Sequence, residues 1–143
     1  MSMVIDIADA IVTALEADVA ADEFGISFKP ERKLVPAFEI DELNTLRVTV
    51  FPKANEQEIA DRSRNRHDVT VDIGIQKRIA GDAEVEQLLD LVETIDSRLS
   101  RRQLEAVPAR YVNSQNQPVY SPEHLTSQNV FTSVLTLTYR ALR

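Results

Sequence analysis

The sequence predicts one α+β domain over residues 1–143, with a mainly antiparallel sheet of four to five strands, two packed helices and a long charged hairpin arm. Three patterns predict this class. Apolar residues recur at helical spacing in two segments, alternate with polar residues in several others, and are nearly absent from one charged interval. A chain of 143 residues can bury a core without a metal or a disulfide, and its 27% of charged residues includes both signs, so we expect it to fold alone.

The first helix is expected over residues 5–20. Ile7, Ile11, Leu15 and Val19 recur at steps of four and form a stripe that packs on the sheet. The other face is acidic, because the first 23 residues carry a charge of −6 and no basic residue. We expect this face to be solvated, with docking to a basic partner as the alternative. Its acidic residues are Asp6, Asp9, Glu16, Asp18, Asp22 and Glu23.

The pattern becomes extended after Gly25 and predicts one or two edge strands, because Pro30 and Pro36 exclude a central position in a sheet. The apolar residues of this part are Ile26, Phe28, Leu34, Val35, Phe38 and Ile40. Residues 45–51 form a clearer strand, and Pro52 is expected to end it. In that strand Leu46, Val48 and Val50 point inward, while Arg47 and Thr49 point outward.

A second strand over residues 69–75 is expected to pair with residues 45–51 as an antiparallel hairpin. Its inward residues are Val69, Val71, Ile73 and Ile75. The interval 53–68 is far longer than a hairpin turn, and Ile59 is its only large apolar residue, so it should project from the body. We expect a contact arm, with a mobile solvated loop as the alternative. Acidic residues precede basic ones in the order Glu56, Glu58, Asp61, Arg62, Arg64 and Arg66, and alternate arginines share one side if the segment is extended.

The second helix is expected from Asp82, as N-cap, to Gln103. Its acidic residues precede its basic ones, which suits the helix dipole. Its apolar residues, at spacings of three and four, are Val85, Leu88, Leu89, Val92, Ile95 and Leu99. A short strand over Arg110–Asn113 follows Pro108, and Ser121 with Pro122 predicts a single helical turn within Tyr120–Leu125.

The final strand alternates without a break from Val130 to Arg140. Eleven residues at about 3.3 Å each reach roughly 35 Å, so this strand should cross the sheet or extend past it, where a neighbouring subunit would supply a partner. One face carries Phe131, Ser133, Leu135, Leu137 and Tyr139. The other carries Thr132, Val134, Thr136, Thr138 and Arg140.

We expect no catalytic, cofactor or metal site. The chain has two histidines, no cysteine and only three glycines, too few for a phosphate-binding loop. A metal site at His67, Asp68 and Asp72 is rejected because Asp72 is expected on an exposed strand face, and His124 is expected to cap a turn. The pair Asp41 and Glu42 shows no spacing that would share a proton. A net charge of −7 argues against nucleic acid as the main partner, and no segment predicts a leader or a membrane span.

The order of these elements resembles that of the tail terminators of long-tailed phages. The segments that carry the resemblance are IADAIVTAL, LRVTVFPK, VTVDIGIQKRI, EVEQLLDLVETI, VYSPEHL and FTSVLTLTYR. Together they span most of the chain and specify packing, whereas none specifies chemistry. Head–tail adaptors and stoppers of the same junction are the first alternative. A soluble ligand-binding or enzymatic α+β domain is the second.

The resemblance implies a structural, non-enzymatic virion protein of the phage neck, assembled in the host cytoplasm. Such a protein forms a homo-oligomeric ring, commonly of six copies, that caps the last ring of tail tube protein, ends tube growth and docks the head connector. A ring needs two different complementary surfaces on each subunit. We expect Arg62, Arg64 and Arg66 to meet the acidic surfaces of the first and second helices of the next subunit. Glu56, Glu58 and Asp61 are expected to belong to the same subunit or partner interface. Thr132, Thr136 and Thr138 are expected to line a lumen or to pair with another chain's sheet edge.

Overall fold

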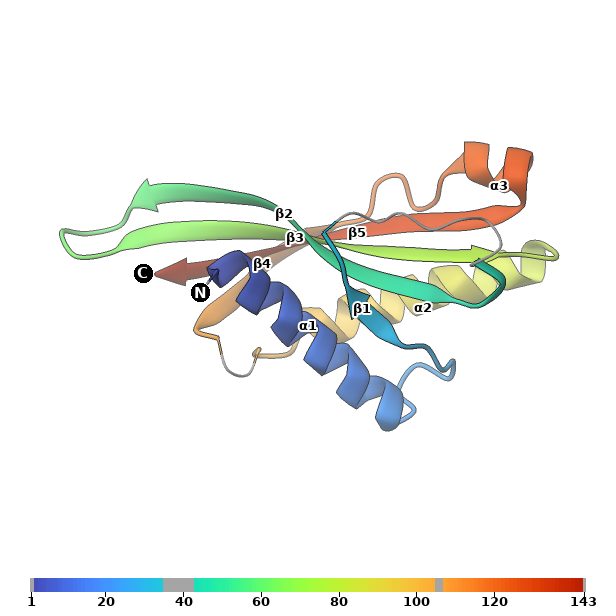
Figure 1. Cartoon of the computed structure of the whole chain (residues 1–143), viewed down its shortest axis with the longest axis horizontal. Coiled ribbons are helices and arrows are strands. Elements are labelled where there is room, and N and C mark those ends of the chain that lie inside the picture. Colours follow the sequence, from blue (N-terminus) through green and yellow to red (C-terminus); the bar gives the residue numbers. More distant parts are fainter. Residues whose placement is uncertain (1, 35–42, 105–106, 143) are drawn as a thin grey trace.

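A five-stranded sheet with the strand order β1-β2-β3-β5-β4 organises the chain (Figure 1). The structure is a computed structural model that describes residues 2–34, 43–104 and 107–142. The short β1 runs parallel to β2, and the other neighbours are antiparallel, which confirms the predicted α+β class. The strands are β1 (Pro30–Arg32), β2 (Arg47–Ile59), β3 (Asn65–Arg78), β4 (Ala109–Gln115) and β5 (Val130–Leu142).

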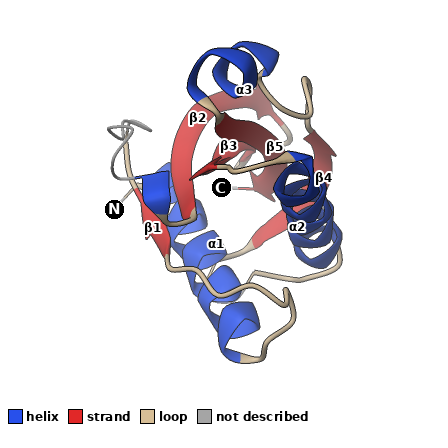
Figure 2. Ribbon diagram, turned by 90° about the vertical axis from the view of Figure 1, so that its right-hand side faces the viewer, coloured by secondary structure: helices blue, strands red, loops and turns tan. Residues whose placement is uncertain are grey.

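The described residues form three helices beside the sheet; two were predicted as packed helices and the third as a single helical turn. Helices α1 (Met3–Ala20) and α2 (Asp82–Ser100) cover one face, whereas the short α3 (Pro122–Gln128) lies beyond the other face (Figure 2). The Ser121 hydroxyl accepts a hydrogen bond from the His124 amide at 3.4 Å, so the predicted cap is confirmed, but the helix continues past Leu125. Among the described residues, no helix has the length and apolar character needed to cross a bilayer.

The ends of the two packed helices differ from the prediction by a few residues. Ser2 caps α1, because its hydroxyl accepts from the Ile5 amide at 3.4 Å, and the helix begins two residues before the predicted start. Asp82 was expected to cap α2, but Gly81 occupies that position without a side-chain bond and Asp82 is the first helical residue. Helix α2 ends at Ser100 and not at Gln103.

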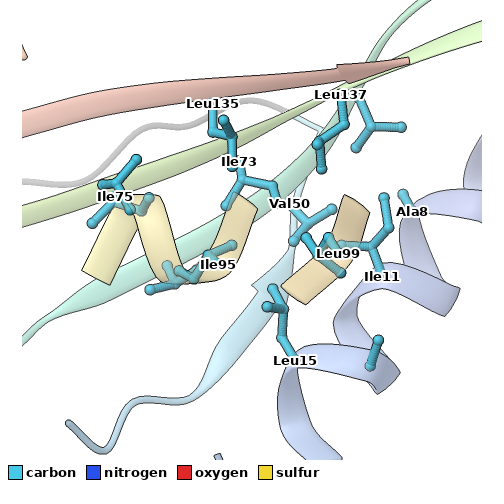
Figure 3. Packing of buried hydrophobic residues seen from close by; sticks show 14 of the residues in the cluster. Ala8, Ile11, Leu15, Val50, Ile73, Ile75, Ile95, Leu99, Leu135 and Leu137 are labelled. Atoms are coloured by element: carbon cyan, nitrogen blue, oxygen red, sulfur yellow. The ribbon is translucent and has the colours of Figure 1, made fainter. Parts of the chain in front are cut away.

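The core lies between α1, α2 and the covered face of the sheet (Figure 3). Ile11 and Leu15 of α1 and Ile95 of α2 are fully buried, as their helical spacing predicted. The strands supply the other wall of the core. Their fully buried residues include Val50, Val69, Val71, Ile73, Ile75, Leu135, Leu137 and Tyr139.

Strand β2 does not stop at Pro52, as the sequence predicted, but continues to Ile59. A register shift between Pro52 and Ala54 marks a β-bulge. A bulge tolerates a proline that lacks a backbone N–H, and β1 pairs with β2 only as far as Val50, so Pro52 interrupts no second ladder. The interval 53–68 is therefore mostly strand, and the alternative of a mobile loop is wrong.

One edge strand, Pro30–Arg32, forms within the described residues 25–34 and pairs with β2. Ile26 and Phe28 lie outside any strand, although Phe28 is buried. The predicted positions Val35, Pro36, Phe38 and Ile40, and also Asp41 and Glu42, lie outside the described residues. The predicted strand 45–51 begins at Arg47.

Strand β5 confirms the predicted alternation and lies inside the sheet. Its odd-numbered residues from Phe131 to Ala141 are buried, while Thr132, Thr136 and Thr138 on the other face are half-buried. It pairs with β3 along its whole length, and from Thr136 to Ala141 also with β4, which is longer than the predicted Arg110–Asn113. From Thr136 to Ala141, the chain's own strands therefore supply partners on both sides of β5.

Candidate functional site

The arm is the end of the β2-β3 hairpin, residues 53–68, and it extends past the helices (Figure 1). Residues 53–64 are all exposed. The turn at its end is held by Asp61, whose Oδ1 accepts from the amides of Ser63 at 2.9 Å and Arg64 at 2.8 Å. The backbone hydrogen bond from Ser63 is the main reason that the pKa of Asp61 lies below its ordinary value. The carboxylate of Asp61 is therefore already bound within the turn.

The predicted arginine row does not form along one strand. Arg62 and Arg64 lie in the turn, whereas Arg66 lies in β3. Arg66 forms an ion pair with Glu58, which is directly opposite it on β2, and Arg64 lies 3.5 Å from Asp61. Arg62 is exposed and has no hydrogen-bond or ion-pair partner within the described residues. Much of the predicted contact charge is therefore neutralised inside the arm.

The two faces of the arm differ in chemistry, because directly opposite residues in antiparallel strands share a face. One face is charged and carries Glu56, Glu58, Arg66 and Asp68. The other face has no acidic or basic pair and carries Asn55, Gln57, Ile59, Asn65 and His67. Ile59 is 85% exposed, the largest fraction among the exposed large apolar residues of the described chain. This neutral face continues the side of the sheet that α1 and α2 cover in the body.

Asp72 is buried, contrary to the expected exposed position on a polar strand face. Only 7% of its surface is exposed, and its Oδ1 accepts from the Thr136 hydroxyl at 2.6 Å. Lys53, at the bulge, brings its ammonium to 4.0 Å from the other oxygen. Thr49, predicted outward, lies on the same side and is also buried, at 2% exposure. This face of the sheet is thus a connected polar surface and not a row of free side chains.

The three predicted threonines of β5 lie on this polar face. Thr136 is bonded to Asp72, and the Thr132 hydroxyl lies 2.9 Å from His124 Nδ1 and 3.5 Å from the Gln76 amide. Thr138 is directly opposite Thr70 of β3. Edge pairing through Thr136 and Thr138 is wrong, because β3 and β4 occupy both sides of β5 there. A lumen-lining role for this face remains a prediction.

The acidic face of α1 is not simply solvated. Asp18 is 2% exposed and accepts bonds from Arg98 at 3.0 and 3.2 Å, while Arg102 approaches it at 2.9 Å. Asp9 pairs with Arg32 at 2.6 Å, and Glu23 pairs with Arg98 at 3.1 Å. Three of the six predicted acidic residues therefore bind the chain's own arginines.

Helix α2 carries a different acidic surface, which we call the α2 acidic stripe. Its members recur at steps of four, four and three, so they lie along one side of the helix, and all are exposed. None of their carboxylates pairs with a cation among the described residues. They are Asp82, Glu86, Asp90 and Glu93. Nothing in the local sequence distinguishes this unpaired stripe from the acidic residues of the α1 region, three of which are paired.

The histidines do not take part in a reactive cluster in the described part of the chain. His67 Nδ1 lies 3.3 Å from the Asn55 side-chain oxygen on the arm, while neighbouring Asp68 is bound to Arg140. Residues 2–34, 43–104 and 107–142 contain no group of three His, Asp or Glu side chains with a geometry suited to a metal ion.

The pair of Asp68 and Arg140 joins the base of the arm to β5 and predicts a pH-dependent stability. Arg140 donates to both Asp68 oxygens, at 2.9 and 3.3 Å, and this bonding lowers the pKa of Asp68. A carboxyl group with a lowered pKa stabilises the fold above its unfolded pKa, about 3.9, and this contribution is lost as the pH falls through the lower folded value. Replacing Asp68 by Asn should therefore lower stability in urea at pH 7 and matter progressively less toward pH 2. An equal effect at both pH values would contradict this.

No protein-family model matches the chain, and no curated protein matches it. Among solved structures, the chain is similar to one from the virion of a native gene transfer agent (GTA) particle. The two share 14% sequence identity with a TM-score of 0.56, and the match covers 94% of this chain and 92% of that chain. At this identity the similarity shows a shared fold, and that fold extends over nearly all of both chains.

Proposed function

We propose that this chain is a structural protein of a phage-like virion. The observation that carries the proposal is the fold shared over nearly the full length with a chain of a gene transfer agent virion. The arm and the α2 acidic stripe support it, because they are distinct exposed surfaces of the kind that ordered assembly requires. In this role the chain makes and breaks no bond.

Within the virion, the proposed position is the neck, as the tail terminator of a long-tailed phage. The chain would form a ring, commonly of six copies, on the last ring of tail tube protein and present its other side to the head connector. The order of elements along the sequence supports this position. If the ring closes only on the end of the tube, the free protein would have a lower mass than the ring.

Deletion of the gene tests the neck position. Without a terminator, tube growth has no stop, so electron microscopy of lysates should show tails of irregular, excess length and heads without tails. Expression of the intact chain from a plasmid should restore uniform attached tails. Unattached tails of uniform normal length would assign the chain to an adaptor or stopper position instead, and normal virions would contradict both.

A reconstituted reaction tests the capping step directly. Purified chain added to polymerising tube protein should halt elongation at low molar ratio, because each ring blocks one tube end. Native mass measurement of the capped ends should give the copy number. A final tube length that does not change with added chain would contradict capping, and an equal amount of serum albumin is the control for crowding.

A further inference from the structure

Two separate places on the surface carry exposed charges of opposite sign. The first is the arm tip, residues 59–64, where Asp61 is bound within the turn while the guanidinium groups of Arg62 and Arg64 remain largely exposed. The second is the α2 acidic stripe. Its C-terminal half borders an open surface depression of about 550 Å³, to which Thr94, Ser97 and Arg101 contribute.

We propose that the arm tip of one copy docks against the α2 acidic stripe of a second copy. Arg62 and Arg64 meet the carboxylates of the stripe, and Ile59 is covered by the same contact. This inference deepens the proposed assembly role and rests on it for its biological meaning.

The arrangement of the two surfaces favours a contact between copies. The arm leaves one end of the sheet, whereas α2 begins near the opposite end, where β3 finishes at Arg78 (Figure 1). The arm is a paired β-ribbon, so it does not fold back onto its own α2. A contact between different surfaces of identical chains repeats from copy to copy and closes into a ring when the rotation allows.

Charge complementarity selects a second copy over other occupants. The residues 53–68 carry four basic and four acidic side chains, too balanced for a phosphate backbone. The stripe residues succeed one another along a helix and do not converge on one point, so they do not form a cation site. Two guanidinium groups opposite a row of carboxylates are complementary in charge, and each guanidinium can donate two parallel hydrogen bonds to a carboxylate.

The structure also changes which charged residues we expect to form the contact between copies. Arg66 is bound to Glu58, and Asp9, Asp18 and Glu23 of the α1 side are bound to Arg32 and Arg98. These groups would have to break an existing pair before meeting a partner. Arg62 and the stripe carboxylates face no such cost, and Arg64 would give up only its exposed pair with Asp61 at 3.5 Å. Because ion pairs at these places are exposed, the association should weaken with salt.

A charge swap tests the contact. We expect Arg62→Glu with Arg64→Glu, or Glu86→Lys with Asp90→Lys, to raise the dissociation constant for self-association at least about tenfold in sedimentation velocity at 50 mM salt. The combined fourfold variant should return to within about threefold of the wild type, because the charges are again complementary. Glu16→Lys with Glu123→Lys makes the same charge change on exposed residues of α1 and α3 and should have a smaller effect than the stripe variant. A combined variant as weak as either pair overturns the proposal.

Disulfide trapping tests the same contact even when association is transient, because the chain contains no cysteine. Ser63→Cys at the tip and Gln87→Cys beside the stripe are prepared separately and then mixed under mild oxidation. We expect the mixed dimer to exceed that formed by Ser63→Cys with Thr13→Cys, an exposed position on α1. Equal yields overturn the proposal. Specific trapping together with normal tails after gene deletion would preserve this contact and reject the neck position.

Discussion

A chain that ends at Leu137 is expected to lose its cooperative fold. The truncation removes five of the thirteen residues of β5, Thr138–Leu142, and the strand is paired with both β3 and β4 as far as Ala141. It also removes Tyr139, which is fully buried and meets the Tyr111 ring edge-on at 6.1 Å between centroids. Loss of one buried aromatic side chain costs about 3–5 kcal/mol, a large share of the roughly 5–15 kcal/mol that stabilises a domain.

The measurement is thermal unfolding followed by far-UV circular dichroism. The truncated chain should show no sigmoidal transition, whereas removal of only Leu142 and Arg143 should change stability by less than about 1 kcal/mol, because Leu142 is 46% exposed. A cooperative transition in the longer truncation would show that the end of β5 extends outward as an assembly element. The internal position of β5 argues for the first outcome.

Periodicity predicted the parts of this fold that bury a core. The alternation of β5 and the spacing of Ile7, Ile11 and Leu15 record which residues face the interior, and both predictions are confirmed. The outer part of the arm has no interior, because residues 53–64 are all exposed. Its strands therefore carry no alternating apolar pattern, so the sequence predicts a projecting arm but not that β2 and β3 continue into it. A rule that ends every strand at proline also cannot predict the β-bulge after Pro52.

The hydrogen-bond partners of the buried carboxylates could not be predicted from the sequence, for another reason. Asp72 receives its hydrogen bond from Thr136, 64 residues away, and Asp18 is bound by Arg98, 80 residues away. Nothing local distinguishes these two carboxylates from exposed neighbours on the same elements. The sequence predicted which segments carry the candidate contact surfaces, but only the fold separates charges that are already paired from those left for a partner.

Replacement of Asp18 by Ala should destabilise the chain by about 2–3 kcal/mol. Removing one partner from a buried ion pair costs about 3–5 kcal/mol, and the cost here is smaller because the side chains of Arg98 and Arg102 are 36% and 32% exposed and can regain water. Asp18 also stands in the last turn of α1, which contains no basic residue, so the helix dipole opposes its charge and Arg98 and Arg102 must offset that. Urea unfolding at pH 7 measures the change.

Glu16→Ala is the matched control, since it removes an exposed carboxylate near the same helix end and should change stability by less than about 0.5 kcal/mol. An Asp18→Ala variant as stable as this control would mean that Arg98 and Arg102 gain as much from water as from the carboxylate. The expected loss has a further consequence for assembly. Asp18 joins the C-terminal end of α1 to that of α2, so its removal should loosen α2 and weaken self-association through the α2 acidic stripe, although Asp18 itself touches no partner in the proposed contact.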